Sequence, residues 1–168
     1  MSFIGIISER KCLENIKPHI SKIEDINIIH INSKSIENIK NIKFETIIID
    51  SDINKLEKQS NVLEKIFLNA KYLLVNTDVN IKFDIKNIEK TKIITYGLNR
   101  KAIVTVSSIS DQYILVCLQK ELINKENIKQ EVGEKRIKID SKNKLKIYEI
   151  LLIYIIYMIN NHEIIEII

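Results

Sequence analysis

The chain has 168 residues, of which 45% are hydrophobic and 29% charged, and its formal net charge at pH 7 is +4. This length favours one domain, and the apolar fraction is too high for a disordered chain. Three glycines and one proline exclude collagen and flexible linkers. Ile, Lys and Asn occur 40, 23 and 17 times and have A/T-rich codons, so the composition indicates a genome of low GC content.

The positive charge is almost entirely lysine, spread along the chain between Glu and Asp residues. No basic run lies near aromatic residues suited to stacking, so we expect no dedicated nucleic-acid surface. Three scattered histidines and two distant cysteines lack the spacing of a metal site, and we expect no metal or cofactor. Residues 1–11 lack the pattern of an export signal, which predicts a cytoplasmic protein.

The first hundred residues alternate short apolar runs with helical patterns. The runs are continuous rather than alternating, which is typical of parallel strands covered on both faces. We therefore predict a Rossmann-like α/β fold with a mostly parallel sheet of about five strands and helices on both faces. The predicted strands are 3–7, 26–31, 46–49, 72–75 and 93–96, and the predicted helices are 9–20, with Ser8 as N-cap, 35–42 and 56–70.

After Gly97 the pattern changes to an antiparallel extension. Residues 102–108 and 113–118 read as a hairpin, and 136–140 alternates as a half-exposed strand. No linker interrupts the chain, so we predict a single domain: parallel βα units over 1–100, the extension over 101–141, and a helix and tail over 142–168.

The last segment is unusually apolar. Residues 147–159 are apolar except for Glu149, but 13 residues are too few for the ~20 that a membrane span needs. We predict a helix buried on most sides, with no membrane span. Its three tyrosines leave two alternatives to a core helix, namely contact with a membrane surface or with another subunit. The Ile-rich tail 162–168 needs a covering surface, so a homodimer through this helix and tail is one such alternative.

Polar residues follow each predicted strand. In parallel sheets the carboxyl ends of the strands form a crevice where ligands bind, although polar residues there are also ordinary turn chemistry. The candidate ligand-binding residues are Ser8, Asp50, Asn76 and Asp78. Grouping of Asp50, Asp52 and Asp78 around Mg²⁺ is less favoured than solvated carboxylates. We assign no catalytic residues.

Several catalytic and nucleotide-binding motifs are missing. The sequence contains no GxxxxGK[ST] phosphate loop, no GxGxxG dinucleotide fingerprint and no GxSxG nucleophile elbow. The first strand is followed by Ser8-Glu9-Arg10, without a glycine. These absences argue against ATP hydrolysis, conventional dinucleotide binding and serine hydrolase chemistry.

Two stretches together resemble the central domain of the Mur ligases, which add amino acids or peptides to UDP-N-acetylmuramate with ATP. Residues 72–78 (YLLVNTD) resemble the strand ending in a VLNADD-type motif, and 92–99 (KIITYGLN) resemble the ITYG motif that follows it. Residues 100–106 resemble the strand that then starts a hairpin, and the final apolar helix fits the same order. The resemblance covers about residues 70–160.

The departures from that family decide the expected function. The GTNGKT phosphate loop, the HNxxN-like adenine-binding stretch and the C-terminal ligase domain have no match in this chain. Phosphoryl transfer depends on that loop and its Mg²⁺. The resemblance therefore implies a non-catalytic Mur-ligase-like protein that binds a protein partner or a nucleotide-like ligand, linked to cell-envelope metabolism. The alternatives are a small-molecule sensor or enzyme using the strand-end crevice, and a structural oligomer subunit.

Overall fold

The computed structural model describes residues 2–23, 25–80, 90–140 and 145–167. The chain divides into two compact units, one formed by residues 1–14 and 24–94 and the other by 15–23 and 95–168. The fold is α/β with mostly parallel strands in the first unit, as the apolar runs predict. Among the helices of the described residues, none is long and apolar enough to cross a membrane.

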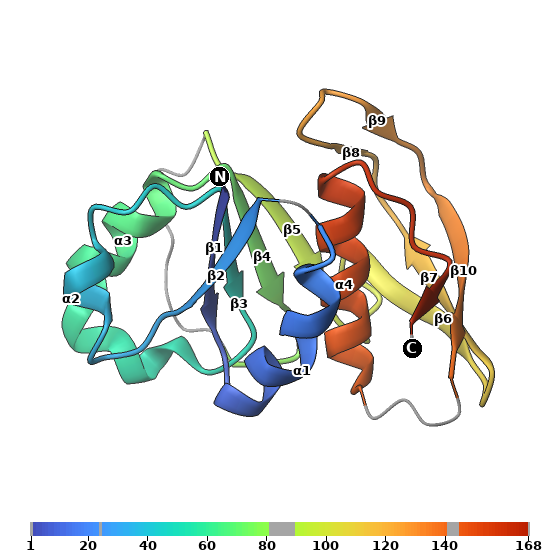
Figure 1. Ribbon diagram of the computed structural model, residues 1–168, viewed down its shortest axis with the longest axis horizontal. Helices are drawn as coiled ribbons and strands as arrows, with labels where there is room; N and C mark the ends of the chain where they lie inside the picture. Colours follow the sequence, from blue (N-terminus) through green and yellow to red (C-terminus); the bar gives the residue numbers. More distant parts are fainter. Residues whose placement is uncertain (1, 24, 81–89, 141–144, 168) are drawn as a thin grey trace. The chain divides into compact units, whose positions relative to one another are not determined.

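The first unit is built on parallel strands. Their order is β4-β3-β1-β2, and β5 begins beside β4, where the Lys92 amide donates to the Lys71 carbonyl at 2.9 Å. All these strands run in one direction, so their carboxyl ends meet at one edge, the lower edge in Figure 1. The strand bounds are β1 (Ser2–Ile7), β2 (Ile26–His30), β3 (Thr46–Ile49), β4 (Tyr72–Asn76) and β5 (Lys92–Tyr96).

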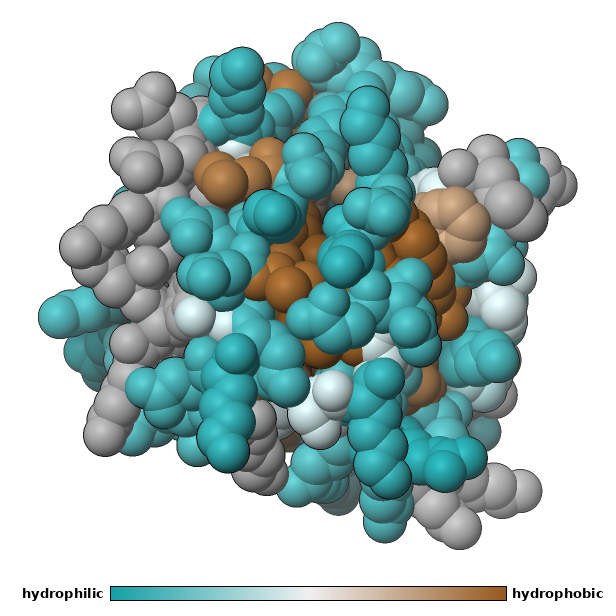
Figure 2. Space-filling model, turned by 90° about the vertical axis from the view of Figure 1, so that its left-hand side faces the viewer, coloured by the Kyte–Doolittle hydropathy of each residue, from teal (hydrophilic) through white to brown (hydrophobic). Residues whose placement is uncertain are grey.

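The helices α2 (Ile36–Ile39) and α3 (Ser60–Leu68) lie on one side of these strands (Figure 1). Helix α2 is shorter than predicted. The helix predicted at 56–70 begins instead as a 3₁₀ segment, η1 (Ile53–Gln59), where the Asp52 side chain accepts the Asn54 amide at 2.9 Å. Figure 2, which faces this side, shows apolar surface ringed by hydrophilic side chains. Beneath it lies a core of buried aliphatic and aromatic residues that includes Ile47, Leu63, Phe67 and Leu73.

The second unit contains antiparallel strands. Strand β7 (Tyr113–Leu118) lies between β6 (Val104–Ile109) and β10 (Gly133–Ile139), as the predicted hairpin and third strand require. Two features are new: a separate ribbon of β8 (Leu122–Ile123) and β9 (Lys129–Gln130), and the tail strand β11 (Glu166–Ile167), parallel to β10. Ile164 and Ile167 of the tail are buried within this unit, whereas Ile165 is exposed.

Helix α4 (Ile147–Ile159) and the second half of α1 (Arg10–Ile20) complete the second unit. Glu149, the one charged residue of α4, is 2% exposed. Its carboxylate accepts the Asn15 side-chain amide at 2.9 Å and the Lys146 backbone amide at 2.7 Å. The Tyr157 hydroxyl also donates to the His19 carbonyl at 3.0 Å. Hydrogen bonds between α1 and α4 therefore give the Glu149 carboxylate and the Tyr157 hydroxyl partners that an apolar core would not supply.

His19 makes the stability of the fold depend on pH. Burial and, secondarily, Lys22 lower the pKa of His19 below 6.5. Below about pH 6.5 the unfolded chain binds a proton that the folded chain resists, so stability falls as the pH drops toward the folded pKa. We expect the urea midpoint of the wild type to fall more between about pH 7.5 and 5 than that of His19→Gln. Replacing the exposed His162 by Gln is the control, and equal pH slopes for wild type and His19→Gln would contradict the assignment.

Candidate functional site at the carboxyl edge of the first unit

The carboxyl ends of the parallel strands carry the polar residues that the sequence predicts. Ser8 follows β1, Asp50 follows β3, and Asn76 ends β4. The Asp50 amide donates to the carbonyl of Ile7 at 2.9 Å, so the ends of β3 and β1 are hydrogen-bonded side by side. Two polar clusters form along this edge, one after β3 and β4 and one after β1 and β2.

The first cluster joins three of the four predicted site residues. Asn76 is 3% exposed; its Nδ2 donates to Asp50 Oδ1 at 2.9 Å, and its Oδ1 accepts the Asp78 amide at 2.9 Å. Both ends of the Asn76 amide are used, which fixes its orientation. Asp50 is half-buried and Asp78 is exposed. Asn76 thus holds one carboxylate and shapes the turn that presents the other.

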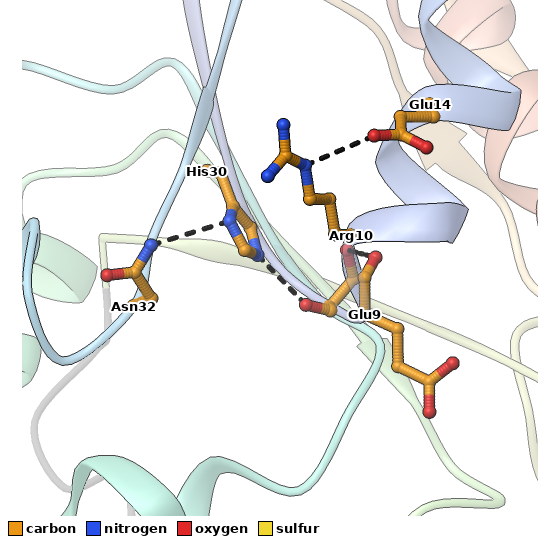
Figure 3. A network of polar contacts seen from close by, with 6 residues as sticks. Glu9, Arg10, Glu14, His30 and Asn32 are labelled. Atoms are coloured by element: carbon orange, nitrogen blue, oxygen red, sulfur yellow. Dashed lines mark hydrogen bonds and ion pairs between the residues drawn. The ribbon is translucent and has the colours of Figure 1, made fainter.

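The second cluster contains the fourth predicted residue, Ser8, and centres on His30 (Figure 3). His30 Nε2 lies 2.9 Å from the Ser8 carbonyl, and its Nδ1 lies 3.4 Å from Asn32 Nδ2. The Asn32 Oδ1 accepts the amides of Lys34 at 2.9 Å and Ser35 at 3.1 Å, so the Asn32 amino group must face the ring. A carbonyl therefore faces Nε2 of the ring and an amino group faces Nδ1, which suits a proton carried on Nε2.

Sequence analysis did not select His30 or Ser35. His30 is the last residue of an apolar strand, and position alone gave no reason to separate it from a core histidine. The signal that could have found it is Asn32, a polar residue that directly follows the predicted strand 26–31 and whose turn directs its amide toward the ring. Ser35 closes the same turn, because its hydroxyl donates to the His30 carbonyl at 3.1 Å.

Ser8 does not have the role predicted for it at the start of α1. It is 9% exposed, and its hydroxyl donates to the Glu9 carbonyl at 3.0 Å instead of accepting a helix amide. The prediction of Ser8 as N-cap is therefore wrong. The first turn closes on Glu9, whose carbonyl accepts the Cys12 amide at 3.1 Å. Further along α1, Arg10 pairs with Glu14 at 3.1 Å on the exposed surface (Figure 3).

The chemistry available at this edge is hydrogen bonding through carboxylates. Asp52 is directed to the 3₁₀ segment, where it accepts the Asn54 amide. Within the part of the chain that the structure describes, no group of three or more His, Cys, Asp or Glu residues is placed to hold a metal ion. Asp50 and Asp78 already make contacts within the chain, and each carboxylate has several lone pairs, so both can also accept the hydroxyl or amine hydrogens of a ligand.

Comparison with known proteins does not assign the chain to a family. No family model matches the chain, and no curated protein matches it. The fold and the two polar clusters are therefore the observations from which a function can be inferred.

Proposed function

We propose that this chain is a non-catalytic binding protein that holds a small polar ligand at the carboxyl edge of its first unit. The observation that carries the proposal is the buried Asn76, which orients the Asp50 carboxylate through one bond and the backbone of Asp78 through another. A buried amide with both ends satisfied keeps acceptor groups in place before a ligand arrives. The location agrees with the general rule that open parallel sheets bind ligands beyond their carboxyl ends.

The donors that suit these carboxylates are hydroxyl and amine groups. A sugar or ribose presents such hydroxyls, so a nucleotide-like ligand with its sugar against Asp50 and Asp78 fits the acceptors. Hydrogen bonds to a charged acceptor contribute about 1.5–3 kcal/mol each. Without a phosphate loop the edge binds such a ligand but provides no cradle for phosphoryl transfer.

Kinship with the Mur ligase central domain is a part of the same proposal. It is supported by the order of elements from β4 through β5 to the β6–β7 hairpin, β10 and α4, which is the order that the resemblance implies. Under this proposal the chain is a pseudoenzyme connected with cell-envelope metabolism in a low-GC bacterium. Asn76 and Asp78, which lie in the YLLVNTD stretch, are then contacts inherited from a nucleotide crevice.

The experiment is a thermal-shift panel with ATP and Mg²⁺, ADP, UDP-muramoyl peptides and cyclic dinucleotides. A ligand at about 100 times its dissociation constant adds about 2.7 kcal/mol to stability. For the compound that raises the midpoint, we expect Asp50→Asn to weaken binding about tenfold or more, because the charge is lost while Asn can still accept the Asn76 bond.

Asp52→Asn is the matched control. It removes the same charge two residues away, and Asn is as good a helix cap as Asp, so the binding constant should stay unchanged. A panel in which no compound raises the midpoint, or equal weakening by both substitutions, would contradict the proposed site.

A further inference from the structure

Strand β2 is the outermost strand of the first unit, and among the described residues no strand pairs with its outer edge, where backbone groups face outward in a regular pattern. The Ile31 amide donates to the Ile6 carbonyl at 2.8 Å, and β2 pairs with β1 in the register Ile6↔His30 and Ile4↔Ile28. In a parallel ladder with this register, the odd-numbered residues of β2 bond to β1 and the even-numbered residues turn outward. The outward amides and carbonyls are those of Ile26, Ile28 and His30.

This edge lacks the devices that proteins use to block strand addition. The strand reads INIIH, without Lys, Arg, Asp, Glu or Pro, and its pairing with β1 shows no bulge. All five side chains are half-buried. Edge strands are normally shortened, charged or interrupted, because an open row of N–H and C=O groups is a template for another strand.

The edge of the second unit shows what such protection looks like in the same chain. Strand β11 there has only two residues. Lys138 pairs with Glu166 at 2.8 Å beside it, and Lys135 pairs with Glu163. Two tail residues are also buried within this unit, since Ile164 and Ile167 are 6% and 1% exposed. Unlike β11, the described strand β2 carries neither charged pairs nor a bulge.

We propose that β2 is a homodimer interface, formed by antiparallel pairing of β2 with the β2 of a second copy about a two-fold axis at Ile28. The occupant is a second copy because the strand is self-complementary in this register. The outward groups of Ile28 face those of the partner's Ile28, and the groups of Ile26 face those of the partner's His30. An odd number of outward residues, centred on Ile28, lets every outward amide find an outward carbonyl.

The side chains agree with this pairing. It sets Ile28 against the partner's Ile28 and Asn27 against the partner's Ile29, and directly opposed branched apolar residues stabilise antiparallel pairs. Within the strand Ile26–His30 no like charges face one another across the axis. The His30 carbonyl already accepts the Ser35 hydroxyl at 3.1 Å and keeps a second lone pair for the partner.

Sedimentation equilibrium of the full chain tests the interface. We expect a mass of twice 19.6 kDa for the wild type, and of 19.6 kDa for Ile28→Lys at the same concentration. Two lysines would meet on the axis, and like-charge juxtaposition costs several kcal/mol, which corresponds to a dissociation constant raised about 100-fold or more. Ile165→Lys, which adds the same charge at a side chain 66% exposed in the second unit, should remain dimeric. A wild type of single-chain mass, or an Ile28→Lys variant that stays dimeric, would overturn the proposal.

Amide hydrogen exchange on the wild type keeps the test valid even if Ile28→Lys fails to fold. As concentration rises, the amides of Ile26, Ile28 and His30 should slow together. The amides of Asn27 and Ile29 are bonded to β1 and should be protected at every concentration. Exchange at the three outward amides that does not depend on concentration, in a protein of dimeric mass, would assign the dimer to another surface.

Discussion

Replacing Gly5 by Ala is expected to lower the free energy of unfolding by about 1–3 kcal/mol. Gly5 lies in the middle of β1, paired on one side with Ile29 of β2 and on the other with Ile47 of β3. A Cβ atom at this position would lie 2.6 Å from Ile31 Cδ1, 2.7 Å from Ile47 Cδ1 and 3.1 Å from Phe44 Cδ1. These side chains are almost fully buried and well packed, so they have little room to move away.

Urea denaturation monitored by circular dichroism measures this effect. Gly133→Ala is the matched control, because a Cβ there meets no atom within 4 Å. That control should be neutral or slightly stabilising, since alanine restricts the unfolded chain. If the two alanine variants have the same stability, the close packing at Gly5 is not what the structure indicates.

Replacing Asn124 by Ala is expected to cost about 2–3 kcal/mol. Asn124 is 1% exposed, at the end of β8. Its Oδ1 accepts the amides of Glu126 at 3.0 Å and Ile128 at 2.8 Å, and its Nδ2 donates to Asn161 Oδ1 at 3.2 Å. Each such bond contributes about 1 kcal/mol, and its loss leaves a polar group without a partner. The variant should also loosen the attachment of the β8–β9 ribbon to the end of α4.

The free energy of unfolding of the variant tests this, and hydrogen exchange at the amides of Glu126 and Ile128 locates the effect. Asn38→Ala, at an exposed position of the first unit, is the control and should change stability by no more than about 0.5 kcal/mol. Unchanged exchange at the two amides after loss of Asn124 would show that the ribbon is held by other contacts.

Much of the candidate site could be located from the sequence, but its hydrogen bonding could not. Polar residues directly after apolar runs predicted that Asp50 and Asn76 would reach one edge of a parallel sheet. That Asn76 donates to Asp50 depends on the pairing of β3 with β4 and on a register that no local pattern encodes. His30 could not be selected from the sequence, because its hydrogen bonds depend on the turn from Asn32 to Ser35 that follows the strand.

The sequence by itself determined the class of fold and most of its larger elements. Continuous apolar runs, helical spacing and the change of pattern after Gly97 are local signals, and they produced the parallel first unit, the β6–β7 hairpin and α4. The absence of a phosphate-loop motif could also be read directly from the sequence. Only the tertiary structure decided which polar residues are buried and which apolar tail is covered. Asn124, Glu149 and strand β11 depend on neighbours far away in the chain, and the free energy of burying a polar group is set by the partners that the fold brings to it.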